Sequence, residues 1–282
     1  MSLKKSPIVF TDLDGTLLDH VNYAFDSALP TLESLQENGI PVVFNTSKTQ
    51  PESVSLAQAM GLCHPIIIEN GGAIVVPAGY DFEAMDALTH DWNKVGEVIP
   101  LGAAITDIQS VLTDAERTLG LSGLYSTFSA MGIEEICALT GLDSKAAEMA
   151  KYRNFSEPIV WNGNEDQLSS LESFIEAYQL KIVQGGRFHH IIGDTDKCTA
   201  MVHLSQMYED SANMQRQVIK IALGDSQNDR EMLNGADIAV VVNNESGTGI
   251  TISHENVIRT ENEGPDGWRE GIEIALSRLA CV

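Results

Sequence analysis

The chain has 282 residues, 43% of them hydrophobic, and can bury the core of one large domain or of two modest ones. Its 17 basic residues stand against 40 acidic ones, a formal net charge of -23. Such a charge repels nucleic acids and anionic membranes, and we expect neither as a partner. A phosphorylated substrate would also be repelled, unless a cation or a basic cluster reversed the field at its site.

We expect a cytoplasmic protein, because the sequence has no recognisable targeting signal and its cysteines form no disulfide pattern. No stretch reads as a signal peptide or as a membrane span. The four cysteines lie far apart without a CxxC pair, which favours reduced thiols over a zinc site or a disulfide framework. They are Cys63, Cys137, Cys198 and Cys281. The sequence does not indicate an oligomeric state.

Buried strands and helices alternate along the first part of the chain. Apolar runs without alternation predict buried strands, and helical spacing closed by Gly39 and Gly61 predicts helices. The expected strands cover residues 7–10, 40–44, 66–68 and 73–76, and the expected helices residues 27–38 and 51–60. This alternation is typical of a doubly wound α/β fold, in which ligands lie beyond the carboxyl ends of the parallel strands.

The alternation resumes late in the chain, after a middle region of different character. Strands are expected over residues 218–223 and 238–242, and a last helix over 268–279. In the middle, we expect helices over 101–119, 133–149 and 168–178, and strands over 157–161, 181–184 and 188–192. We therefore predict a Rossmann-like parallel-sheet core over residues 1–82 and 192–282, with an inserted α+β cap domain over residues 83–191.

Two carboxylates, Asp12 and Asp14, follow the first strand in the stretch DLDGT. Residues two apart on a strand share a face, and Gly15 allows the turn that brings both to the sheet edge. Alone, the stretch could be an Asp-rich turn that caps a helix. As chemistry, one carboxylate can attack phosphorus while the other gives and takes a proton, provided that Mg²⁺ offsets the repulsion between anions.

A second acidic loop, residues 224–229 with the sequence GDSQND, follows the late strand. Asp225 and Asp229 offer the oxygen ligands that Mg²⁺ prefers, with the Asn228 amide between them. A calcium-like loop or a plain turn would also fit this loop alone. Combined with the first motif, the loop favours a magnesium site.

Two further segments can complete a phosphoryl site. Thr46 and Ser47 end the second strand, where a hydroxyl and backbone amides can hold phosphoryl oxygens or cap the next helix. Lys197 opens a helix and can neutralise both the phosphoryl group and Asp12, although alone it would read as a surface lysine.

These four pieces, in this order, resemble the haloacid dehalogenase superfamily, with the pattern DxDxT, Ser or Thr, Lys and GDxxxD. The insert resembles the cap of its Cof-like sugar-phosphatase branch. The resemblance implies that Asp12 is the nucleophile and Asp14 the acid and base, with Ser47 and Lys197 also catalytic. It implies that Mg²⁺ is held by Asp12, the Asp14 carbonyl and Asp225, supported by Asp229 and Asn228.

Within that branch, five stretches make nearly the whole chain similar to the mannosyl-3-phosphoglycerate phosphatases, enzymes of compatible-solute (mannosylglycerate) synthesis. The stretches are NTSKT at 45–49, ENGG at 69–72, RNFSEP at 153–158, GGRFHH at 185–190 and GPDGW at 264–268. Cys198 departs from the pattern, in which a glycine follows the lysine.

The resemblance implies a substrate with a phosphate, a carboxylate and sugar hydroxyls, in which the sugar is mannose or glucose. Arg187 suits bidentate binding of the carboxylate, and Gly186 permits close approach. The other expected substrate-binding residues are Thr46, Lys48, Glu69, Asn70, Arg153 and His189. His189 and His190 could equally be packed strand residues, and Trp268 reads as a core residue.

Two other functions remain open at this point. One is a phosphatase or mutase of the same architecture for another sugar phosphate, of the trehalose- or sucrose-phosphate type. The other is a non-catalytic Mg²⁺-binding regulatory domain, but Asp14 and the large cap favour turnover of a small substrate.

Overall fold

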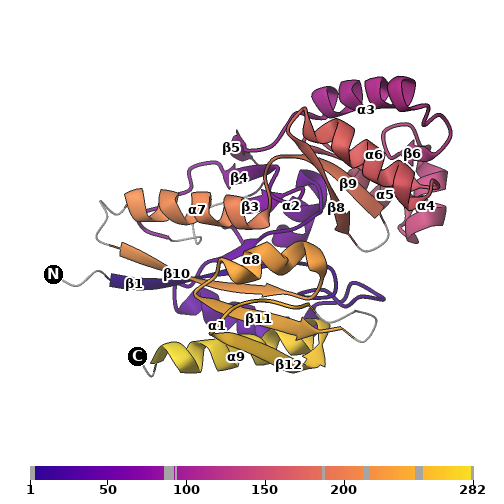
Figure 1. Cartoon of the computed structure of the whole chain (residues 1–282). Helices are drawn as coiled ribbons and strands as arrows, with labels where there is room; N and C mark the ends of the chain where they lie inside the picture. The colour runs from indigo at the N-terminus through magenta and orange to yellow at the C-terminus, as the bar shows by residue number, and fades with distance from the viewer. Residues whose placement is uncertain are drawn as a thin grey trace.

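The fold is built on a five-stranded parallel sheet with the order β12-β11-β10-β1-β2 (Figure 1). The computed structural model describes residues 4–85, 92, 94–185, 188–211, 216–244 and 250–280. The strands of this sheet are β1 (Lys4–Thr11), β2 (Val42–Phe44), β10 (Arg216–Gly224), β11 (Ile238–Asn243) and β12 (Val257–Glu263). All neighbours pair in parallel, so their carboxyl ends meet at one edge.

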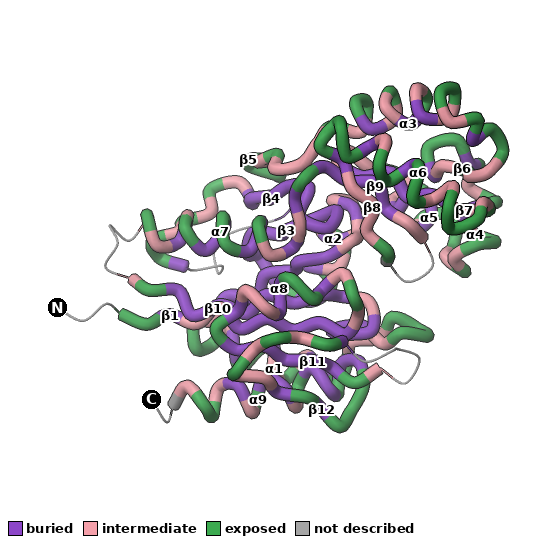
Figure 2. Tube along the Cα trace, viewed as in Figure 1, coloured by how far each residue is buried: buried purple, intermediate pink, exposed green. Residues whose placement is uncertain are grey.

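Helices cover both faces of this sheet, which explains why its central strands are apolar without alternation (Figure 2). One face packs on α1 (Leu29–Glu37) and α9 (Gly264–Ala280), and the other on α7 (Lys197–Ser211) and α8 (Arg230–Asn234). A further helix, α2 (Gln50–Ala59), begins with a capping box of Thr49 and Glu52.

A small antiparallel sheet continues from the edge of the core. It has the order β3-β4-β5, with β3 (Ile66–Ile68), β4 (Ala73–Pro77) and β5 (Val95–Pro100). A bridge between Asn45 and Ile67 joins it to the end of β2.

The cap is a four-stranded antiparallel sheet of order β6-β7-β9-β8 with helices packed on it. Its strands are β6 (Tyr125–Thr127), β7 (Ser156–Trp161), β8 (Leu180–Gly185) and β9 (Phe188–Gly193). Its helices are α3 (Ile105–Leu119), α4 (Ile133–Thr140), α5 (Ser144–Lys151) and α6 (Glu165–Glu176). Ile159 and Ile191 pack with α3 and α6 on one face of the sheet, while Val160 and Phe188 pack with α4 and α5.

The predicted fold class is confirmed: a doubly wound parallel core with helices on both faces. The single helix expected over 133–149 is two, because Gly141 takes a left-handed conformation and ends α4, and Asp143 caps α5. The cap boundaries expected from the sequence, residues 83 and 191, do not coincide with the ends of the strands and sheets in the structure. β5 lies beyond residue 82 but pairs with β4, and residue 191 lies inside β9.

Three strands were missed, each for a physical reason. β5 and β12 are edge strands of mixed polarity, and β6 has only three residues, so none carries a buried apolar run. Among the described residues, no helix combines the length and the hydropathy that crossing a membrane requires.

The start of α9 requires glycine at position 267. A Cβ there would lie 2.1 Å from the carbonyl oxygen of Asn262 and 2.9 Å from Thr260 Oγ1. A helical alanine gains about 0.5–1 kcal/mol over glycine, but this contact with rigid backbone outweighs that gain.

We therefore expect Gly267→Ala to lower the free energy of unfolding by about 1–3 kcal/mol, as overpacking does. Gly132→Ala is the control, since a Cβ at Gly132 meets no atom within 4 Å. It should change stability by less than about 1 kcal/mol. Urea unfolding of both variants measures the difference, and equal effects would contradict the steric explanation.

Candidate active site

The predicted catalytic residues meet at the carboxyl edge of the parallel sheet. Asp12 follows β1, Thr46 and Ser47 follow β2, and Asp225 follows β10. Lys197 is the first residue of α7, and Asp229 ends the short 3-10 helix Gln227–Asp229. Segments separated by up to about two hundred positions are thus brought to one point by the parallel topology.

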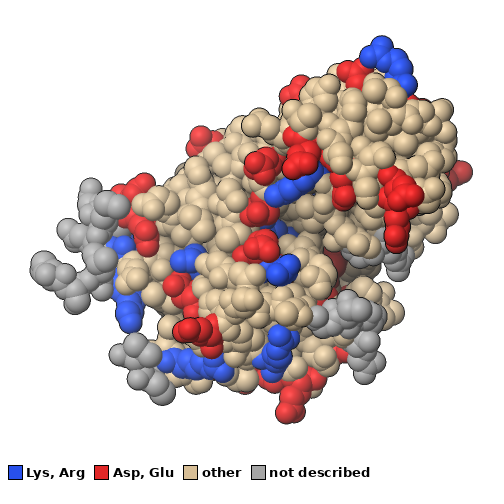
Figure 3. Space-filling view, viewed as in Figure 1, with Lys and Arg blue, Asp and Glu red and all other residues tan. Residues whose placement is uncertain are grey.

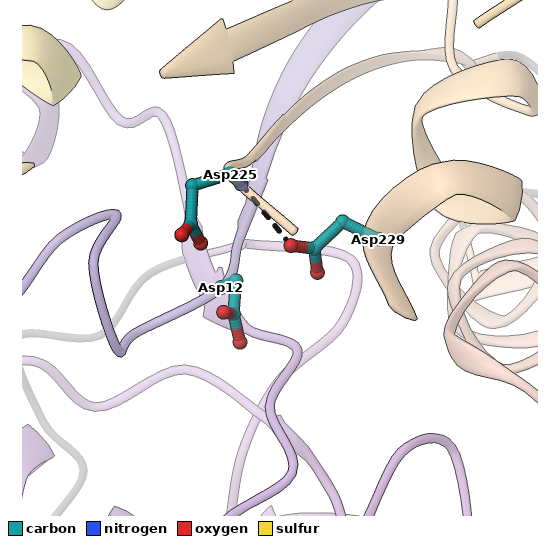
Figure 4. A group of neighbouring side chains, drawn as sticks. All are labelled: Asp12, Asp225 and Asp229. Atoms are coloured by element: carbon teal, nitrogen blue, oxygen red, sulfur yellow. Dashed lines mark hydrogen bonds between the residues drawn. The ribbon is translucent and has the colours of Figure 1, made fainter. Parts of the chain in front are cut away.

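Three carboxylates converge there. Asp12, Asp225 and Asp229 each offer an oxygen, and these oxygens all lie within 4.8 Å of one another (Figure 4). All three residues are buried. Asp229 is fixed by its second oxygen, which accepts hydrogen bonds from the backbone N–H groups of Asp225 and Ser226 at 3.1 Å.

Lys197 lies among these carboxylates and is almost completely buried. Its Nζ donates to Asp12 Oδ1 at 2.6 Å and to Asp229 Oδ1 at 2.7 Å. Burial alone would lower the pKa of Lys197, but Asp12 and Asp229 raise it above its ordinary value, so the lysine stays charged. The sequence prediction that Lys197 faces Asp12 is confirmed.

Asp225 is held by two residues outside its own loop. Thr16 Oγ1 donates to its Oδ1 at 2.9 Å, and Asn244 Nδ2 donates to its Oδ2 at 2.6 Å. Gly15 leaves room for this carboxylate, since a Cβ there would lie 2.7 Å from Asp225 Oδ2. Thr16 is the last residue of the DLDGT stretch and Asn244 directly follows β11, but nothing in their spacing marks them as partners of Asp225.

The cluster carries more negative charge than Lys197 offsets. Burial, together with repulsion from Asp229, raises the pKa of Asp225 to about 6. Burial and the charges of Asp229 and Asp225 also raise the pKa of Asp12 well above its ordinary value, despite Lys197. A divalent cation would relieve this repulsion, and a set of carboxylate oxygens is what Mg²⁺ prefers. The residues therefore fit the predicted ion.

Asp12 keeps one oxygen available. Its Oδ1 accepts from Lys197, and among the described residues no hydrogen bond reaches its Oδ2. The backbone behind it is fixed: the buried Trp268 indole donates to Thr11 Oγ1 at 3.0 Å, and Thr11 Oγ1 donates to the Asp12 carbonyl at 2.7 Å. Trp268, expected to be a core residue, is one and also supports the strand end that carries Asp12.

The Asp14 side chain lies apart from the three-carboxylate cluster. Its Oδ1 is 2.8 Å from Lys48 Nζ, which also lies 5.1 Å from the centre of the Tyr23 ring. Burial alone would lower the pKa of Lys48, but Asp14 and Glu52 raise it. The Asp14 carboxylate is therefore held by the Lys48 ammonium, while the expected role of the Asp14 carbonyl in metal binding stays a prediction.

The loop after β2 presents Ser47 to the site. Thr46 is buried, and its Oγ1 accepts from the backbone N–H of Lys48 at 3.1 Å, which shapes the loop. The Ser47 carbonyl accepts from Arg153 at 3.1 Å, and among the described residues no hydrogen bond occupies the Ser47 hydroxyl. Thr46 thus builds the loop, and the Ser47 hydroxyl is the group available to a phosphoryl oxygen.

Glu69 connects the core to the cap. Its buried carboxylate accepts from the backbone N–H groups of Asn154 and Phe155 at 3.0 Å and from Ser156 Oγ at 2.6 Å. These three donors occupy the carboxylate that sequence analysis assigned to substrate hydroxyls.

Asn70 lies between Glu69 and the acidic loop. Its Oδ1 accepts from Asn228 Nδ2 at 3.3 Å, and its buried Nδ2 has no partner among the described residues. Asn228 Oδ1 in turn accepts from Ser226 Oγ at 2.5 Å. Asn228 therefore links Asn70 to the acidic loop, and Asn70 Nδ2 is a donor available to a ligand.

The two histidines of β9 lie on opposite faces of the cap sheet. His189 pairs directly with Ile159, which packs under α3 and α6, and so lies on that helix-covered face. His190 lies on the other face and is buried, without a partner for its Nδ1 among the described residues. His190 Nδ1 is thus a buried nitrogen available to a ligand, and the substrate contact expected of His189 stays a prediction. Gly186 and Arg187 lie outside the described residues.

Cys198, which stands where the family pattern has glycine, fits against a glycine elsewhere. A Cβ at Gly235 would lie 2.3 Å from its sulfur, so Gly235 makes room for the Cys198 side chain. The departure changes packing between α7 and the end of α8 and leaves Lys197 in place.

Comparisons with known proteins agree with this geometry. The family model for the haloacid dehalogenase-like hydrolases matches residues 9–267. A glucosyl-3-phosphoglycerate/mannosyl-3-phosphoglycerate phosphatase of Methanococcoides burtonii is 36% identical, over 94% of this chain and 95% of the relative. A phosphatase of the same name from Persephonella marina is 35% identical, over 96% and 98%.

Solved structures share the fold at low identity. A phosphatase of the haloalkanoate (HAD) enzyme superfamily from Bacteroides thetaiotaomicron superposes with a TM-score of 0.68 at 17% identity, over 99% of this chain and 96% of that one. The sucrose-phosphatase of Synechocystis, solved with sucrose and phosphate, has a TM-score of 0.59 at 13% identity, over 97% and 98%.

The repulsion among the three carboxylates predicts that the stability of the protein depends on pH. In metal-free buffer, the folded pKa of Asp225, about 6, lies above its unfolded value. Folding therefore favours the protonated form, and stability is lost as the pH rises toward 6. We expect Asp225→Asn to gain stability relative to the unmodified protein by roughly 1 kcal/mol between pH 5 and pH 7.5.

Urea unfolding at the two pH values, with and without Mg²⁺, measures this difference. Added Mg²⁺ should stabilise the unmodified protein most at the higher pH. Asp114→Asn, at a surface ion pair with Arg117, is the control and should show no such trend. A difference that stays constant with pH would contradict the predicted repulsion.

Proposed function

Because the chain belongs to the haloacid dehalogenase-like hydrolases and is a phosphoric monoester hydrolase, we propose that it hydrolyses a glycosyl-3-phosphoglycerate. The products are the glycosylglycerate and phosphate, the sugar is glucose or mannose, and the reaction depends on Mg²⁺. The observation that carries the proposal is Asp12, whose unshared carboxylate oxygen stands in a buried cluster with Lys197. The similarity to two phosphatases named for this substrate, over at least 94% of the chain, supports the choice of ester.

In the proposed mechanism Asp12 is the nucleophile. Its Oδ2 attacks phosphorus, an aspartyl-phosphate forms, and the bond from phosphorus to the glycerate oxygen breaks. Asp14 gives its proton to that leaving oxygen and then takes one from the water that attacks the aspartyl-phosphate. Release of phosphate restores the Asp12 carboxylate.

The neighbouring residues supply charge and position. Lys197 holds the Asp12 carboxylate and offsets its repulsion from the phosphate. Ser47 is placed to hold a phosphoryl oxygen, and Lys48 fixes Asp14. Mg²⁺, bound by Asp12, Asp225 and Asp229, would neutralise phosphoryl charge as the bond breaks.

Acidic side chains border the hollow between core and cap in the space-filling view (Figure 3). Among the described residues, Lys48, Arg153 and Lys197 are cations inside the site that can attract an anionic substrate.

A substrate panel tests the proposal. We expect kcat/KM with Mg²⁺ to be at least about 100-fold higher for glucosyl- or mannosyl-3-phosphoglycerate than for trehalose, sucrose or hexose phosphates, as additional polar contacts allow. EDTA should abolish turnover and Mg²⁺ should restore it, while Asp12→Asn should be inactive on every substrate. A preference for another sugar phosphate would overturn the substrate, and activity of Asp12→Asn would overturn the nucleophile.

Asp14→Asn tests the proton transfer. We expect kcat on the glycosyl phosphoglycerate to fall about 10²–10⁴-fold, because the leaving alkoxide needs a proton. The loss on p-nitrophenyl phosphate should be smaller, because p-nitrophenolate leaves without one. Equal losses on both substrates would show that Asp14 acts in some other way.

A further inference from the structure

Arg153, just after the end of α5, lies between cap and core. Of its guanidinium nitrogens, only Nη1 has hydrogen-bond partners among the described residues. Its Nη1 donates to the Ser47 carbonyl at 3.1 Å and to Ser156 Oγ at 3.0 Å. Its Nε is buried without a partner, and no hydrogen bond reaches Nη2 among the described residues. The Nε–Nη2 edge is one that binds a carboxylate through two parallel hydrogen bonds.

Among the described residues, Arg153 has no ion-pair partner, although acidic residues are abundant in this chain. The protein has 40 acidic residues against 17 basic ones. No carboxylate oxygen of the described residues lies within ion-pair distance of its guanidinium. The carboxylate of Glu69, which shares Ser156 Oγ with Arg153, binds Ser156 and the backbone of Asn154 and Phe155. A partly buried guanidinium with an unpaired N–H group costs stability unless a ligand completes it.

His190 lies on the same surface of the cap. It pairs with Pro158, which is two residues from Ser156 on the same face of β7. Only 6% of His190 is exposed, and its Nδ1 is an unpaired buried nitrogen. Burial and the nearby charge of Arg153 lower the pKa of His190 to about 3, so its imidazole is neutral. A neutral ring can donate to or accept from an uncharged ligand oxygen.

The hydrogen bond from Arg153 to the Ser47 carbonyl places Arg153 and His190 relative to the expected reaction site. Arg153 is bonded to the backbone of the loop that presents Ser47, so its guanidinium lies beside that loop. In a 3-phosphoglycerate ester, two carbon atoms separate the ester oxygen from the carboxyl carbon. A carboxylate on Arg153 would thus belong to the leaving alcohol, close to the phosphate.

We propose that Arg153 and His190 form a subsite for the leaving alcohol, in which Arg153 binds its carboxylate through Nε and Nη2 and His190 bonds the oxygen beside it. This inference deepens the proposed function and rests on it for the identity of the ester. It assigns a role to His190, which the sequence patterns left unassigned, and it gives Arg153 the carboxylate that the sequence analysis expected at Arg187.

The first experiment compares a glycosyl-3-phosphoglycerate with its amide, in which the carboxylate is replaced by an uncharged carboxamide. For the unmodified protein with Mg²⁺, we expect the acid to have a kcat/KM at least about tenfold higher. Arg153→Gln should lower kcat/KM for the acid about 10–100-fold, mainly through KM, and should remove the preference over the amide. Hydrolysis of p-nitrophenyl phosphate, which lacks a carboxylate, should fall less than hydrolysis of the acid.

Two further variants separate recognition from packing. Arg153→Lys keeps the charge but loses the paired hydrogen bonds, and should fall between the unmodified protein and Arg153→Gln. Arg117→Gln, on an exposed side chain of α3, is the matched control and should change nothing. Equal losses on the acid, the amide and p-nitrophenyl phosphate would overturn the proposal, since Arg153 would then only hold the Ser47 loop.

His190 has its own pair of variants. His190→Phe keeps a ring and removes the nitrogens, and we expect KM for the acid to rise about tenfold. His190→Asn retains a polar atom near the position of Nδ1 and should recover part of that loss. His189→Phe, on the opposite face, should have the smaller effect. The reverse order of the two phenylalanine variants would overturn the assignment of His190.

Inhibition by a fragment distinguishes failure of this subsite from failure of the proposed substrate. D-Glycerate, but not glycerol, should inhibit hydrolysis of p-nitrophenyl phosphate by the unmodified protein, and Arg153→Gln should relieve that inhibition. This result would support the subsite even if the substrate panel favoured another ester. Equal effects of glycerate and glycerol would overturn it.

Discussion

The burial of three carboxylates around one lysine is the constraint on which the rest of the site depends. Lys197 can satisfy only part of the charge of Asp12, Asp225 and Asp229, and the remaining repulsion would drive these side chains apart if the backbone allowed it. The parallel sheet does not allow it, because Asp12 and Asp225 extend directly from adjacent paired strands. The fold therefore stores a local excess of negative charge that a cation, and then a phosphoryl group, can complete.

Much of this arrangement follows from the sequence, because parallel topology converts order along the chain into proximity. Polar segments after apolar strands had to meet at one sheet edge, which was enough to group Asp12, Ser47 and Asp225. Lys197 could be added because it opens a helix. The partners of Asp225 could not be predicted in this way: Thr16 and Asn244 reach it through loop geometry that no periodic pattern encodes.

In the cap, the sequence could not predict which residues face a ligand. Alternation on β9 indicates that His189 and His190 face opposite ways, but not which of them lies on the face under α3 and α6, because both flanking positions are apolar or aromatic. That choice is made by the packing of Ile159 and Ile191 under α3 and α6. In the same way, Glu69 reads as a ligand for hydroxyls until the donors from residues 154–156 are seen to occupy it. Long-range contacts, not local propensity, assign these residues.

The Glu69 contact also determines how the two parts of the molecule can move. Opening the cap by lifting residues 154–156 from the core would strip three hydrogen bonds from a buried carboxylate, a costly step. Substrate entry costs less free energy if the cap tilts about Glu69 and the three hydrogen bonds of its carboxylate stay intact. The cap would then pivot at Glu69, and the part of the cap farthest from Glu69 would move most while residues near Ser47 hold still. Such a tilting motion of the cap would let large sugars enter without displacing the catalytic atoms.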